Sequence, residues 1–215
     1  MEYNLYRSRR KSISIQVKPN GEVLVKAPLN ASLKLINDFV LSKEKWINSH
    51  KQSLLDEKEK YKDYMELNKI VVLGDDLPVL DDGTKYIFGN YEIKHNKNAN
   101  KKCVLKKFLN MLANEYIKSR TNEISKSIGL NFSSIKIISA RKKWGSCNSK
   151  KELKFNYKLV MLPKHLIDYV ICHELCHLVE LNHSDRFWNL MLKLGFNKKA
   201  IRQQLKPYSF VLNMF

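Results

Sequence analysis

Two histidines and a glutamate in the second half of the chain have the spacing of a metal-assisted hydrolytic site. His173, Glu174 and His177 form the pattern His-Glu-x-x-His. On a helix, residues four apart lie about 40° apart around the axis and about 6 Å along it, so both imidazoles can reach one ion at about 2.0–2.1 Å. The glutamate beside them can take a proton from a water activated by the metal and return it to a leaving amine. The spacing therefore predicts one zinc ion per chain, with Glu174 as the catalytic residue.

Chance does not explain this pattern. With 6 histidines in 215 residues and a glutamate frequency of roughly 1 in 20, about 0.01 accidental matches are expected. Apolar residues Leu166, Ile167, Val170 and Ile171 precede the motif with helical spacing. Proline suits the first turn of a helix, so we expect the motif on a helix that begins after Pro163.

The third metal ligand must come from outside that helix. A catalytic zinc takes three protein ligands and keeps one position open. His183 is the candidate, yet on a continued helix it would point about 240° away from His177. The helix must therefore end first. Asn182 can adopt the left-handed conformation that closes a helix, and Ser184 can cap the next one.

Two carboxylates compete with His183 for this role. Glu180 would face the same side as His173 if the helix continued, but its rise of about 10.5 Å makes sharing one ion awkward. Asp185 fits better as a first-turn residue favoured by the helix dipole. Both stay open as alternatives.

The cysteines show no disulfide framework. Cys103, Cys147, Cys172 and Cys176 lack paired spacing, so we expect free thiols in a reducing compartment. Cys172 and Cys176 lie four apart around a histidine. They are open to a metal role or to one as small buried residues, and the second is favoured.

The net charge of +18 has two interpretations. Clustered lysine and arginine bind phosphate and release counterions, which would suit a nucleic-acid partner. Scattered lysines instead indicate a compositional bias. Two compact basic clusters, residues 7–11 and 141–143, are the exceptions.

Composition places the chain among ordinary globular proteins, with 44% hydrophobic and 28% charged residues. No apolar run reaches the roughly 18 residues of a membrane span, and the charged start does not resemble a signal peptide. We therefore expect a soluble, cytoplasmic protein without a membrane partner.

Alternating and helical patterns predict an α+β protein. Several segments read as strands or helices: a hairpin over residues 12–27, a long helix through 35–47, short strands over 69–95, a helix from 104 towards Gly129, and strands near 135–139, 144–147 and 153–155. The polar, turn-prone stretch 95–102 predicts a boundary, with an N-terminal unit at residues 1–98 and a catalytic domain at 99–215.

Taken together, these segments resemble the YgjP-like family of predicted metal-dependent hydrolases, relatives of the SprT-like and WLM zinc metallopeptidases. The match spans nearly the whole chain and rests on the following residues: Arg7–Ile15, Trp144–Cys147, Asn156, Pro163, Asp168–Val170, His173–His177, Asn182–Ser184 and Phe187–Trp188.

The resemblance implies a zinc ion on His173, His177 and His183, with Glu174 as the catalytic residue. It also implies a zincin-like domain, whose active-site helix packs on a small antiparallel-type sheet, preceded by a β-rich unit with a long helix. The third histidine also has the spacing of the metzincin string. Glu180 replaces the glycine of that string, however, and no methionine turn is evident, so a metzincin is disfavoured.

By analogy with zincins, an edge strand beside the motif helix should bind substrate backbone. We expect Trp144, Gly145 and Ser146 to form that edge, with Gly145 allowing close approach. A core role for Trp144 and a bulge at Gly145–Ser146 are equally open. The donor that stabilises the oxyanion could be any of four side chains: Tyr157, Tyr169, Arg202 or Tyr208.

These features favour a zinc metallopeptidase that acts on a protein or peptide substrate. The alternative is a nucleic-acid-associated protein whose basic surface binds DNA and whose protease activity is confined to DNA-bound partners. A metal-stabilised module without catalysis is disfavoured, because Glu174 would then have no role. The substrate and the oligomeric state stay open.

Overall fold

The computed structural model describes residues 2–96 and 98–215. It contains two compact units, Met1–Lys62 and Asp63–Phe215, which divide at the short helix α3 (Lys62–Met65). The expected boundary at residue 98 lies inside the second unit. A separately folding domain that begins at residue 99 therefore stays a prediction.

The first unit is a three-stranded sheet backed by helices. Its strands are β1 (Asn4–Ser8), β2 (Ser14–Val17) and β3 (Val23–Pro28), with β3 in the centre. β2 and β3 form the expected antiparallel hairpin, and β1 pairs with β3 in parallel.

The predicted long helix of this unit is divided at Lys43. It consists of α1 (Leu33–Ser42) and α2 (Glu44–Lys60), because Lys43 leaves the helical region with φ −106° and ψ 7°. The apolar face continues across the break, since Ile36, Val40 and Ile47 belong to the same buried cluster as the inner face of β3.

The second unit begins with short antiparallel strands in the predicted region 69–95. Two sheets are present, β4 with β5 and β6 with β7 and β8, and the strands span β4 (Lys69–Val72), β5 (Asp75–Pro78), β6 (Leu80–Asp81), β7 (Lys85–Phe88) and β8 (Tyr91–Lys94). Leu73 and Gly74 make the tight turn between β4 and β5 with φ of 52° and 96°. A Cβ on Gly74 would lie 2.8 Å from the Cα of Pro163, so this hairpin packs directly on the residue that precedes the motif helix.

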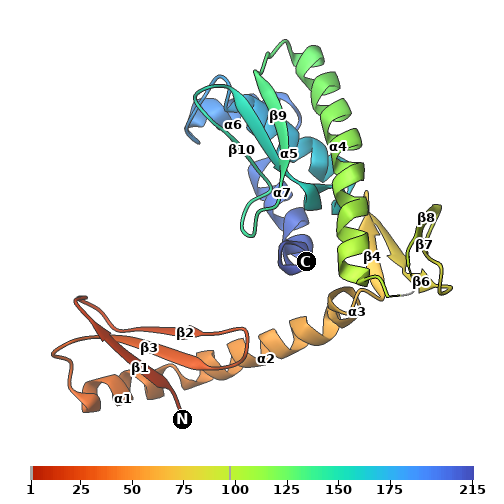
Figure 1. The fold of residues 1–215 in the computed structure, drawn as a ribbon. Coiled ribbons are helices and arrows are strands. Elements are labelled where there is room, and N and C mark those ends of the chain that lie inside the picture. The colour runs from red at the N-terminus through yellow and green to blue at the C-terminus, as the bar shows by residue number, and fades with distance from the viewer. Residues whose placement is uncertain (1, 97) are drawn as a thin grey trace. The chain divides into compact units, whose positions relative to one another are not determined.

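A long helix and a small sheet form the frame of the candidate site. Helix α4 (Lys101–Ile128) ends at Gly129 in the left-handed conformation, with φ 68°. The sheet has the order β10–β11–β9, formed by β9 (Ser134–Ile138), β10 (Gly145–Cys147) and β11 (Glu152–Asn156). Figure 1 shows this sheet beside α4, with α5 packed against it.

This sheet is mixed, whereas the sequence suggested an antiparallel type. β10 pairs with β11 antiparallel, and β11 pairs with β9 in parallel. The strand patterns could not show this, because apolar alternation is the same in either direction. β10 lies at the edge of the sheet, as predicted.

The remaining elements surround the motif helix. They are η1 (Tyr157–Met161), α5 (Lys164–Cys176), α6 (Asp185–Lys193), α7 (Lys198–Leu205) and η2 (Lys206–Asn213). α5 begins after Pro163 and buries the predicted face, Leu166, Ile167, Val170 and Ile171. Each such side chain contributes about 1.5–3 kcal/mol on burial, which holds the helix firmly in the core.

No helix in residues 2–96 and 98–215 combines the length and the apolar character that crossing a bilayer requires.

Candidate metal centre

The three predicted metal ligands meet at one point. In the described chain, His173, His177 and His183 each offer a ligand atom, and these atoms lie within 4.8 Å of one another. The Nε2 atoms of His173 and His183 are 2.9 Å apart. Two nitrogens that bind one tetrahedral zinc at 2.0–2.1 Å would be about 3.3 Å apart, so the histidines are close to a ligating arrangement.

The chemistry of the three donors fits a metal ion. His177 Nδ1 lies 2.9 Å from the backbone oxygen of Glu180. A proton on Nδ1 donated to that oxygen leaves the Nε2 lone pair free for a metal. Burial, followed by the charges of His177 and His183, lowers the pKa of His173 to about 4. Neutral imidazole, the form that binds metal, therefore persists well below neutral pH.

The turn that places His183 differs from the predicted one. α5 ends at Cys176, and a tighter turn follows, in which Leu178 N bonds Leu175 O at 3.0 Å and Val179 N bonds Cys176 O at 3.1 Å. Asn182 is not among the residues with positive φ. The prediction of a left-handed Asn182 was wrong, because the helix ends six residues earlier and Asn182 instead uses its Oδ1 to accept from Ser184 N at 3.2 Å.

Ser184 occupies the N-cap position of α6, as expected, but its side chain makes no capping hydrogen bond. Neither rival carboxylate joins the histidine cluster among the described residues. Glu180 takes part through its backbone oxygen alone, and Asp185 is the first residue of α6.

Glu174 lies buried between the histidines and the edge strand. It is 6% exposed, and a Cβ built on Gly145 would lie 2.8 Å from its Cγ and from its Oε1. Burial raises the pKa of Glu174 to about 7, although the nearby Lys143 and a hydrogen bond from the backbone N–H of Cys147 pull it down. A carboxyl that titrates near neutral pH can both accept and return a proton.

Glu174 therefore requires a residue without a side chain at position 145. The sequence suggested that this glycine admits substrate backbone, or that Gly145–Ser146 forms a bulge. The strand instead pairs regularly, with Gly145 opposite Phe155 and Ser146 opposite Lys154. The absent side chain leaves room for Glu174, while substrate binding by Trp144, Gly145 and Ser146 stays a prediction.

Gly145→Ala should lower kcat by about 10–100-fold, since displacing a catalytic group by even about 1 Å costs rate on this scale. Metal content should stay at the wild-type level, because the three atoms nearest to the added methyl group all belong to Glu174 and none to a histidine. Ser146→Ala, the neighbour on the same strand, is the matched control. Equal kcat for Gly145→Ala and Ser146→Ala would show that Glu174 tolerates the methyl group.

A buried asparagine holds the loop that leads into β10. Asn156 Nδ2 donates to the backbone oxygens of Ala140 at 2.7 Å and Lys143 at 3.0 Å. Its own backbone N donates to Trp144 O at 2.7 Å. These bonds hold the residues that immediately precede the edge strand.

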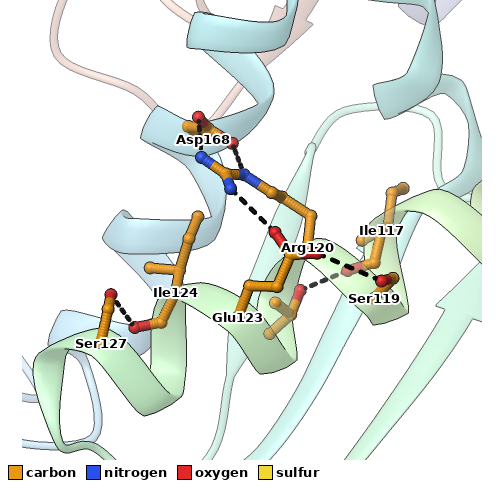
Figure 2. Close-up of polar contacts among 8 residues, drawn as sticks. Ile117, Ser119, Arg120, Glu123, Ile124, Ser127 and Asp168 are labelled. Carbon is orange, nitrogen blue, oxygen red and sulfur yellow. Dashed lines mark hydrogen bonds and ion pairs between the residues drawn. The ribbon is translucent and has the colours of Figure 1, made fainter.

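An ion pair ties α5 to α4 one and a half turns before His173. Arg120 Nε and Nη2 donate to the two carboxylate oxygens of Asp168, both at 2.8 Å, and its Nη1 donates to Glu123 at 2.9 Å (Figure 2). The resemblance included Asp168 but gave it no partner. The bidentate geometry makes the Arg120–Asp168 ion pair stronger than an ordinary surface ion pair.

Arg120→Ala should destabilise the fold by about 1–2 kcal/mol, because it removes both bonds to a partly buried carboxylate. That corresponds to a fall in Tm of roughly 2–8 °C for a unit of this size. Arg120→Lys should recover little, since an ammonium cannot form the two-pronged contact. Glu123→Gln is the control and should change Tm by far less. An unchanged Tm in Arg120→Ala would contradict this.

Two aromatic residues complete the centre, and in the sequence they stood among the residues that carry the family resemblance. The Phe187 ring lies 4.8 Å from His173, 4.6 Å from His177 and 4.8 Å from His183. Trp188 stacks on His183 at 5.8 Å with an interplanar angle of 27°. Their position at the start of the helix that follows His183 could have indicated from the sequence that they lie near the metal ligands.

Of the four candidates for the oxyanion donor, Tyr169 has a ring that borders a predicted metal ligand. Tyr157 is fully buried, and its ring packs against Phe215. Tyr169 lies beside the centre, with its ring 5.7 Å from that of His173. Burial raises its pKa, although the positive charge of Arg202 on α7, a helix that packs against α5, pulls it down. Tyr208 belongs to η2.

The cysteines do not join the centre. Burial raises the pKa of Cys172 to about 12 and of Cys176 to about 11. Both thiols therefore stay protonated at neutral pH and serve as small buried side chains. All four cysteines are free.

A helix packed on a small sheet, three converging histidines and a buried glutamate form the arrangement that the predicted resemblance to zincin-like metallopeptidases implies. The chain matches the model of the YgjP-like metallopeptidase domain over residues 11–208. It belongs to the YgjP-like family, and the predicted resemblance is confirmed.

Other comparisons are narrower. No curated protein matches the chain. A matching solved structure is the metallopeptidase zymogen of Methanocaldococcus jannaschii jannalysin, at 31% identity, covering 44% of this chain and 97% of that chain, with a TM-score of 0.39.

Proposed function

We propose that this metallopeptidase uses one zinc ion, held by His173, His177 and His183, to hydrolyse peptide bonds of a protein substrate. The observation that carries the proposal is the meeting of the three histidine nitrogens within 4.8 Å, with Glu174 as the next residue after the first of them. Three imidazoles with an open fourth position are the ligand set of catalytic zinc. When bound, the metal would supply Lewis acidity that polarises the scissile carbonyl and makes water more acidic.

Glu174 would carry the proton through the reaction. One carboxylate oxygen accepts a proton from the attacking water and then returns it to the leaving amine. Burial against β10 excludes bulk water, and the Cys147 N–H holds the carboxylate in place. His177 keeps its orientation through the Glu180 carbonyl. Tyr169, whose ring lies 5.7 Å from that of His173, is the candidate to donate to the oxyanion.

The free edge of β10 would align the substrate. An extended peptide that adds to this edge bonds through its backbone and needs no particular sequence. Trp144, Gly145 and Ser146 lie on or next to this edge, a few residues from the Cys147 N–H that bonds Glu174.

The test is zinc-dependent cleavage of a random-sequence peptide library by the full chain. The zinc-loaded protein should generate new amino termini, the chelated protein should not, and adding zinc back should restore cleavage. A folded protein with one bound zinc that cleaves no member of the library would overturn the proposal.

A second candidate confines this activity to proteins bound to DNA, on account of the net charge of +18. It predicts tight DNA binding that weakens steeply with salt. One residue of the first basic cluster has an internal role, since Arg7 Nη1 donates to the backbone oxygens of Leu29 at 2.9 Å and Ala31 at 2.7 Å. Weak binding to any polyanion, lost at modest salt, would contradict this candidate.

A further inference from the structure

The C-terminal segment has an unbalanced positive charge. From residue 186 to residue 215 there is no aspartate or glutamate, and the basic residues are Arg186, Lys193, Lys198, Lys199, Arg202 and Lys206. None of them takes part in the ion pairs found within residues 2–96 and 98–215. Their charges are therefore available to an anionic partner.

Several of these side chains surround one hollow on the surface of α7. It has a volume of about 540 Å³ and is lined by Asn197, Lys198, Lys199, Arg202, Gln203 and Lys206. Asn197 is already engaged as the N-cap, since its Oδ1 accepts from Lys199 N and Ala200 N. The rest of the lining is four cations and one amide, with no carboxylate to neutralise them.

The hollow is connected to the metal centre through the Trp188 ring. Lys198 Nζ lies 4.1 Å from the centre of the Trp188 ring, and Trp188 stacks on His183 at 5.8 Å. Arg202 lies on α7, which packs against α5, and on α5 the Tyr169 ring is 5.7 Å from that of His173. Lys198 thus contacts an aromatic ring that borders a predicted metal ligand, and Arg202 follows it about one turn later on the same helix.

We propose that the hollow on α7 is a specificity subsite for an acidic side chain of the peptide substrate, with Lys198 and Arg202 as its principal contacts. The proposal rests on the peptidase function proposed above. A residue in an extended peptide advances about 3.3 Å, so the acidic side chain belongs a few residues from the scissile bond. A guanidinium matches a carboxylate in two-pronged geometry, and the lysine adds a second charge.

The size of the hollow favours a side chain over a nucleic acid. A helix of eight residues is about 12 Å long at 1.5 Å per residue. Specific DNA sites generally bury about 1,000 Å² or more of protein surface. One or two carboxylates fit this length, whereas a duplex needs a longer basic track.

The test measures binding separately from cleavage. Glu174→Gln protein loaded with zinc is titrated with peptides that carry a neutral dye and have Glu or Gln at one scanned position. At low salt, the best Glu peptide should bind about tenfold more tightly than its Gln counterpart. The double variant Lys198→Glu, Arg202→Glu in the same background should reverse this preference, and Lys198→Gln, Arg202→Gln should abolish it. Lys193→Glu, which reverses one charge at an exposed position on α6, is the control and should preserve it.

The binding and cleavage results together distinguish failure of the subsite from failure of the peptidase proposal. Equal binding of all Glu and Gln pairs would overturn the subsite, even if the wild type cleaves peptides well. Selective binding that depends on Lys198 and Arg202, with no cleavage by zinc-loaded wild type, would support the subsite and overturn the peptidase proposal. A 20-base-pair duplex that displaces the Glu peptide, and loses affinity only in the α7 variants, would assign the hollow to nucleic acid and overturn it.

Discussion

Glu174→Gln should lower kcat for peptide cleavage by about 10²–10⁴-fold while leaving one metal ion per chain. The amide has nearly the same shape and can still accept the Cys147 N–H, but it cannot take a proton from water. Because the metal ligands are unchanged, KM should change little. Glu180→Gln is the matched control, since Glu180 contributes its backbone oxygen rather than its side chain to the site. Full activity in Glu174→Gln would remove Glu174 from the mechanism.

The stability of metal-free Glu174→Gln gives a second readout. The raised pKa of Glu174 determines at which pH this variant is more stable than wild type. Burial raises the pKa of Glu174 from 4.5 to about 7, so the folded chain holds a proton that the unfolded chain has lost between these values. The contribution of Glu174 to stability therefore falls as the pH rises through this interval. Glutamine does not titrate. The chelated variant should be more stable than wild type at pH 8, on the order of 2–3 kcal/mol, and no more stable below about pH 4.5.

Urea unfolding of the two chelated proteins at both pH values measures this difference. The change in His173 protonation occurs in both proteins and cancels to first order. A variant that is less stable than wild type at pH 8 would mean that its lost activity reflects damaged packing.

His183→Ala should reduce zinc affinity by more than about 100-fold, because even partners that only orient a ligand are worth 10–100-fold. His183 is the exposed member of the set, so its removal should leave the core intact. Zinc content after purification without chelator, followed by competition with a chelator of known affinity, measures the loss. Peptide cleavage should fall in parallel at limiting zinc.

Two carboxylate variants serve as controls for this experiment. Glu180→Ala keeps the backbone oxygen that His177 faces, and Asp185→Ala changes only the first residue of α6. Both should bind zinc nearly as wild type does. If His183→Ala keeps its zinc and one of these loses it, the third ligand is that carboxylate.

The motif helix was predictable because its determinants are local. The spacing of His173 and His177 and the apolar face before them specify both the helix and its orientation. Pro163 marks its start. His183 came from the ligand count of a catalytic zinc and the edge strand from the analogy with zincins, because no periodicity indicates either of them.

The parts that escaped prediction depend on contacts distant in sequence. The end of α5 at Cys176 is set by tight-turn hydrogen bonds rather than by the left-handed residue proposed at Asn182. Arg120 and Asp168 are 48 residues apart, and no pattern in either segment pairs them. The role of Gly145 is set by a side chain on another element. Alternation along β9 and β11 could not specify that they run in parallel.

The position of β10 has a consequence for how copies of the chain behave towards one another. An edge strand presents unpaired backbone groups that can join the edge of a second molecule and begin aggregation. β10 is only three residues long, and the exposed residues Arg141, Lys142 and Lys143 come just before it. Like charges would face each other if two such edges met, so the strand can stay open to an incoming peptide while discouraging self-association.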